Sequence, residues 1–187
     1  MYNFNSSPTL DSCSFSNNQA DSVGGGMYNF NSSPTLDSCS FSNNQANSAG
    51  GGMYNDESSP TIENSTFSNN QAGNGGGMYN DNASVPDLTL CSFSDNRADH
   101  AGGGMYIANA SNLNLNQCNF LNNQADFEGG GAMISSAIPK LYNCKFDSNH
   151  APIGGGIANI LNASPNLESC AFYRSTHPPV VFTIEFC

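Results

Sequence analysis

Several residue types are scarce in this chain of 187 residues. It contains no Trp, only four Lys and Arg together, and charged residues of both signs make up 10% of it. Because Asp and Glu number 15, the formal net charge is -11. Nucleic acids and anionic membrane surfaces are bound through clustered Lys and Arg. The composition therefore argues against both as partners.

Long apolar segments are also absent. No run approaches the roughly 20 apolar residues of a membrane-spanning helix, so we expect no direct insertion into a membrane. No basic and apolar leader precedes the repeats described below, because Met1 already occupies the first repeat position. We therefore expect the chain to be a piece of a longer protein, with the leader sequence not present in this chain.

What the sequence does contain is a repeat. A Phe recurs at steps of 26 or 27 residues, and the first two units differ only at Asp21/Asn47 and Val23/Ala49. A period of this length indicates a stacked array of structural units. The array covers 1–175 and divides into 1–26, 27–52, 53–77, 78–104, 105–131, 132–156 and 157–175, followed by a C-terminal tail or cap at 176–187.

Local patterns within a unit favour strands over helices. Cys13 and Phe15 alternate with Ser14 and Ser16, as in a strand with one buried face. Each complete unit also contains a Gly triplet, and no apolar residues recur at helical spacing. We expect three short extended segments per unit, at 25–29, 8–10 and 13–20 in the first, with a bend near Asn17. Equivalent segments run in the same direction, so the predicted fold is an all-β parallel β-helix of about seven coils of 25–27 residues.

Two short motifs alternate along the array and carry a family resemblance. Phe-x-x-Asn occurs six times, first at Phe15 to Asn18, and Gly-Gly-Gly is followed by Met in the early units. This pattern resembles the repeats of polymorphic outer membrane proteins, which pair Phe-x-x-Asn with Gly-Gly-Ala-Ile/Leu/Val. The resemblance covers nearly the whole chain, with Gly in place of Ala in the glycine motif. It implies a pectate-lyase-like, right-handed β-helix in a surface-exposed region, and adhesion rather than catalysis.

Identical side chains at the same position of each unit are expected to stack in ladders along the rod. The Phe ladder should fill the core, together with a Leu and Ile row that starts at Leu10. Inward Asn side chains should pass amide hydrogen bonds from coil to coil. The Phe ladder comprises Phe15, Phe41, Phe67, Phe93, Phe120, Phe146 and Phe172, and the Asn ladder comprises Asn18, Asn44, Asn70, Asn96, Asn123 and Asn149.

Cysteine forms a third ladder, two residues before each Phe, with Ser65 in the one gap. We expect these side chains to be buried free thiols, because stacked Cβ vectors run parallel rather than toward each other. Axial disulfides in an oxidising compartment are the alternative, and no Cys-x-x-Cys pair suggests zinc. The members are Cys13, Cys39, Cys91, Cys118, Cys144 and Cys170, with Cys187 outside the pattern.

Candidates for chemistry are few. Asp56 and Asp81 occupy equivalent positions on adjacent coils, where they could form the carboxylate pair of a glycosidase; the other interpretation is two solvated loop acids. Asp and Glu in the loops could bind calcium, but the Gly-Gly-x-Gly-x-Asp nonapeptide is missing. We therefore expect no cofactor and no metal. An outward row of Thr9, Thr35 and Thr61 is the feature that an ice-binding β-helix would extend.

These observations together favour a binding or scaffolding role. We expect a non-catalytic structural or adhesion module, extracellular or on the cell surface and associated with an outer membrane. Its partner would be a surface protein or glycan of a host or neighbouring cell, and the uncapped first coil leaves room for end-to-end self-association. The competing predictions are a carbohydrate-active enzyme, of the polysaccharide lyase or glycosidase kind, and an ice-binding protein.

Overall fold

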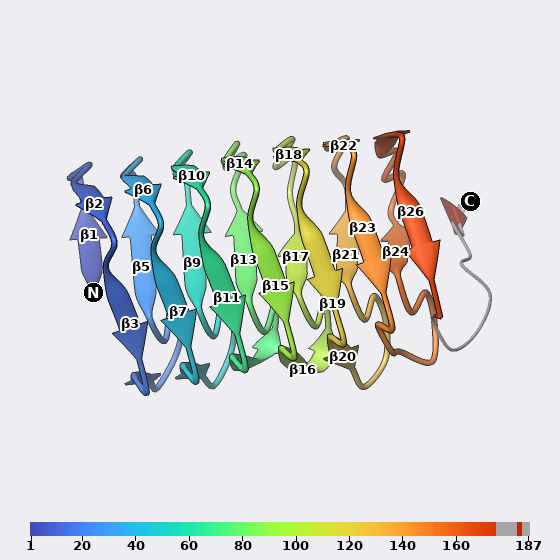
Figure 1. Cartoon of the computed structure of the whole chain (residues 1–187), viewed down its shortest axis with the longest axis horizontal. Coiled ribbons are helices and arrows are strands. Elements are labelled where there is room, and N and C mark those ends of the chain that lie inside the picture. Colours follow the sequence, from blue (N-terminus) through green and yellow to red (C-terminus); the bar gives the residue numbers. More distant parts are fainter. Residues whose placement is uncertain (175–182, 185–187) are drawn as a thin grey trace.

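The chain winds into a rod of stacked turns. A computed structural model describes residues 1–174 and 183–184, and it contains strands but no helix within that part of the chain. Figure 1 shows the turns side by side along the rod, from the first turn (blue) to the last described turn (red). This architecture confirms the predicted all-β parallel β-helix.

Three parallel sheets run the length of the rod and a fourth covers its first five turns; each turn contributes one short strand to a sheet. Sheet A consists of β1 (Tyr2–Phe4), β5 (Met27–Phe30), β9 (Met53–Asp56), β13 (Met78–Asp81), β17 (Met105–Ile107), β21 (Ala132–Ser135), β24 (Ile157–Ile160) and β27 (Thr183–Ile184). Sheet B consists of β2 (Thr9–Asp11), β6 (Thr35–Asp37), β10 (Thr61–Glu63), β14 (Asp87–Thr89), β18 (Asn114–Asn116), β22 (Lys140–Tyr142) and β25 (Asn166–Glu168).

The other two sheets complete the turn. Sheet C consists of β3 (Ser14–Ser16), β7 (Ser40–Ser42), β11 (Thr66–Ser68), β15 (Ser92–Ser94), β19 (Asn119–Leu121), β23 (Lys145–Asp147) and β26 (Ala171–Tyr173). Sheet D is shorter and consists of β4 (Gln19–Ala20), β8 (Gln45–Ala46), β12 (Gln71–Asn74), β16 (Arg97–Ala101) and β20 (Gln124–Ala125). Equivalent residues pair directly, for example Phe67 with Phe93, so the vertical register follows the sequence repeat.

The corners explain why the first five turns have four strands each where the sequence predicted three extended segments. The predicted segment 13–20 is divided by Asn17, whose φ of 56° bends the chain between β3 and β4. Asn5 and Ser12 make the two preceding corners with φ of 50° and 53°. Asn is one of the few residues that tolerate this left-handed conformation, which accounts for the Asn found at many of the corners.

The core is a column of stacked apolar side chains. Adjacent rings of the Phe ladder lie 4.6–5.0 Å apart between centroids and within 11° of parallel. Phe41 to Phe146 of this ladder are fully buried, whereas Phe15 and Phe172, in the first and last described turns, are half-buried. The Leu and Ile row and the Met that opens units two to five pack against the rings. The side chains of each turn are covered by those of the turns before and after it. Stacking therefore forms an apolar core that an isolated turn could not form.

The glycines of each triplet are required for two different physical reasons. The first Gly of each triplet, such as Gly75 with φ of 60°, makes the turn into sheet A. The second and third have no room for a side chain. A Cβ on Gly76 would lie 2.4 Å from the Arg97 carbonyl oxygen, and one on Gly77 would lie 2.5 Å from that of Gly104. Lack of space, rather than positive φ, therefore requires Gly at two of the three positions.

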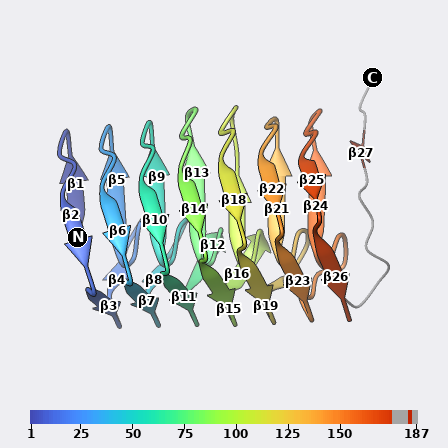
Figure 2. The ribbon, with the colours of Figure 1, turned by 45° about the horizontal axis from the view of Figure 1, so that its top comes forward.

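At the C-terminal end, a short strand continues sheet A. β27 pairs in parallel with β24, with Thr183 opposite Asn159. Figure 2 shows this strand beyond the last full turn. Apart from β27, the predicted tail or cap at 176–187 lies outside the described residues, as do Ser175 and Cys187.

Candidate functional site

The predicted Asn ladder is a continuous hydrogen-bonded chain inside the rod. Each amide oxygen accepts two bonds from the turn before it: Asn96 Oδ1 accepts from Asn70 Nδ2 and from the Asn70 backbone N–H, both at 3.0 Å. The Asn96 Nδ2 group in turn donates to the Phe67 carbonyl at 2.9 Å. All members except Asn18 are buried. These contacts place the ladder in the architecture rather than at a surface open to a ligand.

A second inward Asn ladder was missed by the sequence analysis. Asn3, Asn29, Asn55 and Asn80 pass side-chain hydrogen bonds of 2.7–2.9 Å along sheet A and are all buried. The ladder ends where Ile107 follows Asn80, and the Asn80 Nδ2 group has no partner. A signal was present in the Met-Tyr-Asn motif, because alternation along a strand puts Met and Asn on the same, inward face.

The described cysteines form a ladder of free thiols. Cys13, Cys39, Cys91, Cys118, Cys144 and Cys170 are all unpaired with one another. Each donates to the carbonyl two residues earlier at 3.3–3.6 Å. Ser65 fills the gap, with its hydroxyl 2.7 Å from the Glu63 carbonyl. Burial raises the pKa of the Cys39 thiol, and a protonated, buried thiol is a poor nucleophile. Side-chain hydrogen bonding with Cys118 instead lowers the pKa of the Cys91 and Cys144 thiols.

The two candidate carboxylates lie on the outer face of sheet A. Asp56 and Asp81 are register neighbours at the ends of β9 and β13. Asp56 is held from both sides along the rod: Tyr28 Oη donates to its Oδ2 at 3.4 Å and Asn82 Nδ2 donates to its Oδ1 at 2.7 Å. Both oxygens of this carboxylate are thus engaged by neighbouring turns.

Asp81 repeats the same arrangement one turn further on. Tyr54 Oη donates to its Oδ2 at 3.2 Å and Asn109 Nδ2 donates to its Oδ1 at 2.6 Å. Burial, and then the nearby Asp81 carboxylate, raise the pKa of Tyr54, which keeps its hydroxyl a hydrogen-bond donor. The structure therefore brings Asp56 and Asp81 together, but as two members of a Tyr, Asp and Asn hydrogen-bonded surface.

Sheet B carries the Thr row predicted from the sequence. Its three members are exposed and in register, and the row continues as Asp87 in β14. A second outward row lies two residues along the same strands and carries acids in the first three turns. The Thr row is Thr9, Thr35 and Thr61, and the acidic row is Asp11, Asp37 and Glu63.

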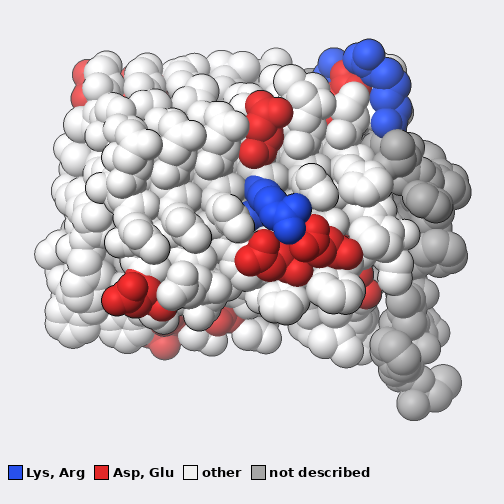
Figure 3. Space-filling view, turned by 90° about the horizontal axis from the view of Figure 1, so that it is seen from below, with Lys and Arg blue, Asp and Glu red and all other residues white. Residues whose placement is uncertain are grey.

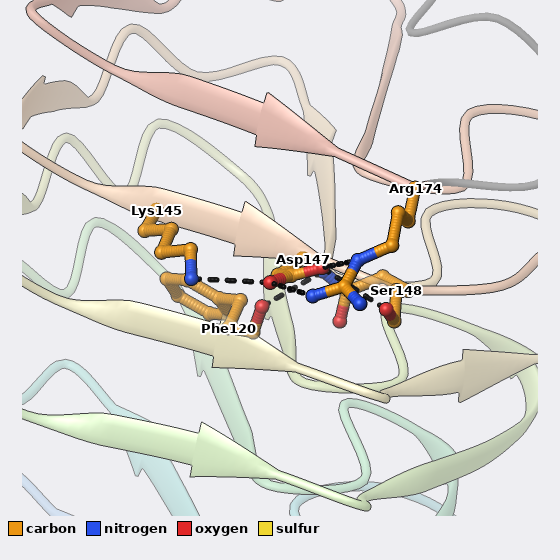
Figure 4. Close-up of polar contacts among 6 residues, drawn as sticks. Phe120, Lys145, Asp147, Ser148 and Arg174 are labelled. Carbon is orange, nitrogen blue, oxygen red and sulfur yellow. Dashed lines mark hydrogen bonds and ion pairs between the residues drawn. The ribbon is translucent and has the colours of Figure 1, made fainter.

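A charged cluster on sheet C was not predicted. The Asp147 carboxylate receives Lys145 Nζ at 3.1 Å, Arg174 Nη2 at 3.1 Å and Nε at 3.2 Å, and Ser148 Oγ at 3.0 Å. Figure 4 shows the two cations approaching this carboxylate from opposite sides. The side chain of Asp147 is only 5% exposed, against 48% for Lys145 and 78% for Arg174. Hydrogen bonds from Arg174 and then Lys145 hold the pKa of Asp147 at about 2.

Two shallow depressions adjoin this cluster and share Lys145 and Asp147. The first has a volume of about 360 Å³ and the second of about 310 Å³. Lys145 Nζ also lies 5.3 Å from the centre of the Tyr173 ring. The further lining residues are Tyr173 and Arg174 in the first depression, and Ser92, Asn119, Phe120 and Leu121 in the second.

Charge is distributed unevenly along the rod. All four Lys and Arg follow residue 96, whereas nine of the 15 acids precede it. Figure 3 shows one cationic group in the middle of a face against acidic groups, and another at the right-hand end. Arg97 pairs with two carboxylates, Asp126 at 2.7 Å and Asp99 at 3.5 Å. The cluster at Asp147 reverses this ratio, with two cations on one carboxylate.

Two further properties concern metals and membranes. Across the described turns, no group of three or more His, Cys, Asp or Glu is arranged to hold a metal ion. Over the same residues, there is no helix with the length and apolar character needed to cross a membrane.

The stacked parallel sheets define the class of the protein as a β-solenoid. Residues 1–136, well over half of the chain, match a protein family described as right handed beta helix region. The chain therefore belongs to the right-handed β-helix family, and the predicted hand is confirmed. No curated protein matches the sequence.

Proposed function

We propose that this β-helix is a non-catalytic structural or adhesion module of an extracellular or cell-surface protein, built from repeats of the polymorphic outer membrane protein type. The Phe-x-x-Asn ladder and the Gly triplets support the assignment to the polymorphic outer membrane protein type of repeat. Its partner would be a surface protein or glycan of a neighbouring or host cell.

The state of Asp56 and Asp81 is the observation that carries the proposal. A glycosidase places two carboxyl groups on either side of a scissile bond, one of them free to give up a proton. Here both carboxylates point from adjacent strands of one sheet, and each is bound by a Tyr of the turn before and an Asn of the turn after. A substrate would have to displace these Tyr and Asn donors to reach either carboxylate, and the donors are part of the surface of sheet A.

The architecture supports a scaffolding role. Seven turns at about 4.8 Å each give a rod roughly 33 Å long with outward side chains at a fixed spacing. Internal ladders of Phe and Asn make each turn rigid relative to the next. A stiff surface of repeated hydrogen-bonding groups can engage a partner over several turns without ordering loops at the moment of binding.

The proposal is tested by measuring binding and degradation on the same samples. The protein is incubated with a panel of neutral and acidic polysaccharides, and the release of reducing ends and of unsaturated products is followed. In parallel, saturable binding to cell surfaces is measured. We expect binding and no release of product. Degradation that disappears in a variant with Asp56→Asn and Asp81→Asn would instead establish the carbohydrate-active alternative.

A further inference from the structure

We propose that Lys145 and Arg174 form a binding site for one oxyanion, a carboxylate, sulfate or phosphate group, borne by a ligand that occupies the depressions on sheet C. The inference concerns a different sheet from Asp56 and Asp81. It is independent of whether the module is catalytic.

Both cations keep hydrogen-bond donors that no other described residue takes up. Arg174 turns Nε and Nη2 toward Asp147, and the guanidinium has five N–H groups in total. Lys145 has three N–H groups and points one of them at the same carboxylate. Because the two side chains are 78% and 48% exposed, their remaining donors face solvent above the sheet. Two cations with free donors are the arrangement that recognises an oxyanion.

Asp147 is the positioning residue of this site. Its carboxylate is 5% exposed and lies beneath the two cations, so it fixes both of them without being the outermost charge. The cluster keeps one net positive charge after Asp147 is counted. The chain as a whole carries -11, which opposes the approach of highly charged ligands over distances up to a Debye length of about 10 Å. A ligand with a single anionic group is therefore favoured.

The depressions provide room and polar groups for the body of such a ligand. Volumes of about 310 and 360 Å³ lie at the lower end of the range for small-molecule sites. Ser92 and Asn119 line one of them beside Leu121, which is 40% exposed. A hydroxyl, an amide and an apolar side chain next to two cations suit a group the size of one sugar ring or one amino acid.

Arg97 is the matched control within the same chain. Like Arg174, it bonds an aspartate of a neighbouring turn, but its guanidinium faces two carboxylates, Asp99 and Asp126. The local charge is thus negative, and an oxyanion should be repelled there.

The test follows the arginine Nε–H signals by NMR while acetate, sulfate or inorganic phosphate is added at constant ionic strength. We expect a saturable shift of the Arg174 signal, with a dissociation constant in the millimolar range, of order 4 kcal/mol of binding free energy. The Arg97 signal should not follow it. Comparing the three anions identifies whether the site prefers a carboxylate or a tetrahedral oxyanion.

Variants separate binding from general effects of charge. Lys145→Gln should weaken the response of Arg174 at least several-fold, whereas Lys145→Arg, which keeps the charge, should retain it. Arg97→Gln should leave it unchanged. Both positions, Lys145 and Arg97, are on the surface, and circular dichroism checks that the three variants fold. The proposal is overturned if Arg97 and Arg174 respond alike to every anion, or if Lys145→Gln has no effect.

Discussion

Asn96 is the residue whose removal tests the internal hydrogen-bonded ladder most directly. In the middle of the rod its side chain makes four hydrogen bonds of 2.9–3.0 Å, two as acceptor from Asn70 and two as donor, to Phe67 and Asn123. Asn96→Ala removes all of them. The backbone N–H of Asn70, which is buried, loses the acceptor provided by Asn96.

The expected loss of stability follows from those contacts. A buried donor left without a partner costs about 1–3 kcal/mol, and each further hydrogen bond lost contributes about 0.5–1.5 kcal/mol. We therefore expect Asn96→Ala to lower the free energy of unfolding by about 2.5–7.5 kcal/mol. At the exposed end of the same ladder, Asn18 uses its amide group for one bond, to Asn44 Oδ1 at 2.9 Å. Asn18→Ala should cost only about 0.5–1.5 kcal/mol.

Equilibrium unfolding in urea measures the loss of stability in each variant, and amide hydrogen exchange measures the protection of the Asn70 backbone N–H. The Asn70 amide should lose protection in Asn96→Ala. Ser94→Ala, on the outward face of the same turn, is the control and should change stability by no more than about 0.5 kcal/mol. The reasoning would be refuted if Asn96→Ala and Asn18→Ala had equal effects, or if the Asn70 amide exchanged at the wild-type rate.

Three further outcomes can be checked by unfolding experiments. Phe93→Ala should lose about 3–5 kcal/mol, because the ring is fully buried between two neighbours; Phe172→Ala, half-buried with one described ring neighbour, should lose less, and equal losses would contradict ring stacking as the cause. Gly76→Ala should destabilise by at least about 1–3 kcal/mol, since its Cβ would meet two backbone oxygens at 2.4 and 2.6 Å, and a neutral result would show that the turns can move apart. The pKa of Asp147 is lowered from 3.8 to about 2 in the folded protein, so its contribution is present above pH 4 and is lost as the pH falls toward 2. The difference in stability between wild type and Asp147→Asn should therefore shrink over that interval, and a constant difference would refute the ion cluster.

The repeat itself determined most of what could be predicted. A Phe at every turn, flanked by Ser or Thr in the first four, gives both the inward face and the vertical register, and β7, β11 and β15 follow that pattern. The Asn that follows three residues later was expected to turn inward, and its amide contacts are those of a ladder. Such features depend only on one turn being like the next, so periodicity is sufficient to find them.

Features that depend on differences between turns were not predictable in the same way. The cluster at Asp147 arises because Lys145, Asp147 and Arg174 replace small or neutral residues in rows that are Ser or Asn in the first two turns. Aligning the rows would have placed the three charges on neighbouring turns. It would not have shown which carboxylate is buried or which donors remain free, because those depend on side-chain conformation.

The tight fit at the second glycine of each triplet also limits how the rod can evolve. Since every turn contacts only the one before and the one after, a whole turn can be inserted or deleted without disturbing distant parts, each adding about 4.8 Å of length. The near-identical units 1–26 and 27–52 are what such an insertion would leave behind. The length of the rod is then set by the number of copies, while the glycines, which admit no side chain, must be inherited unchanged with every copy.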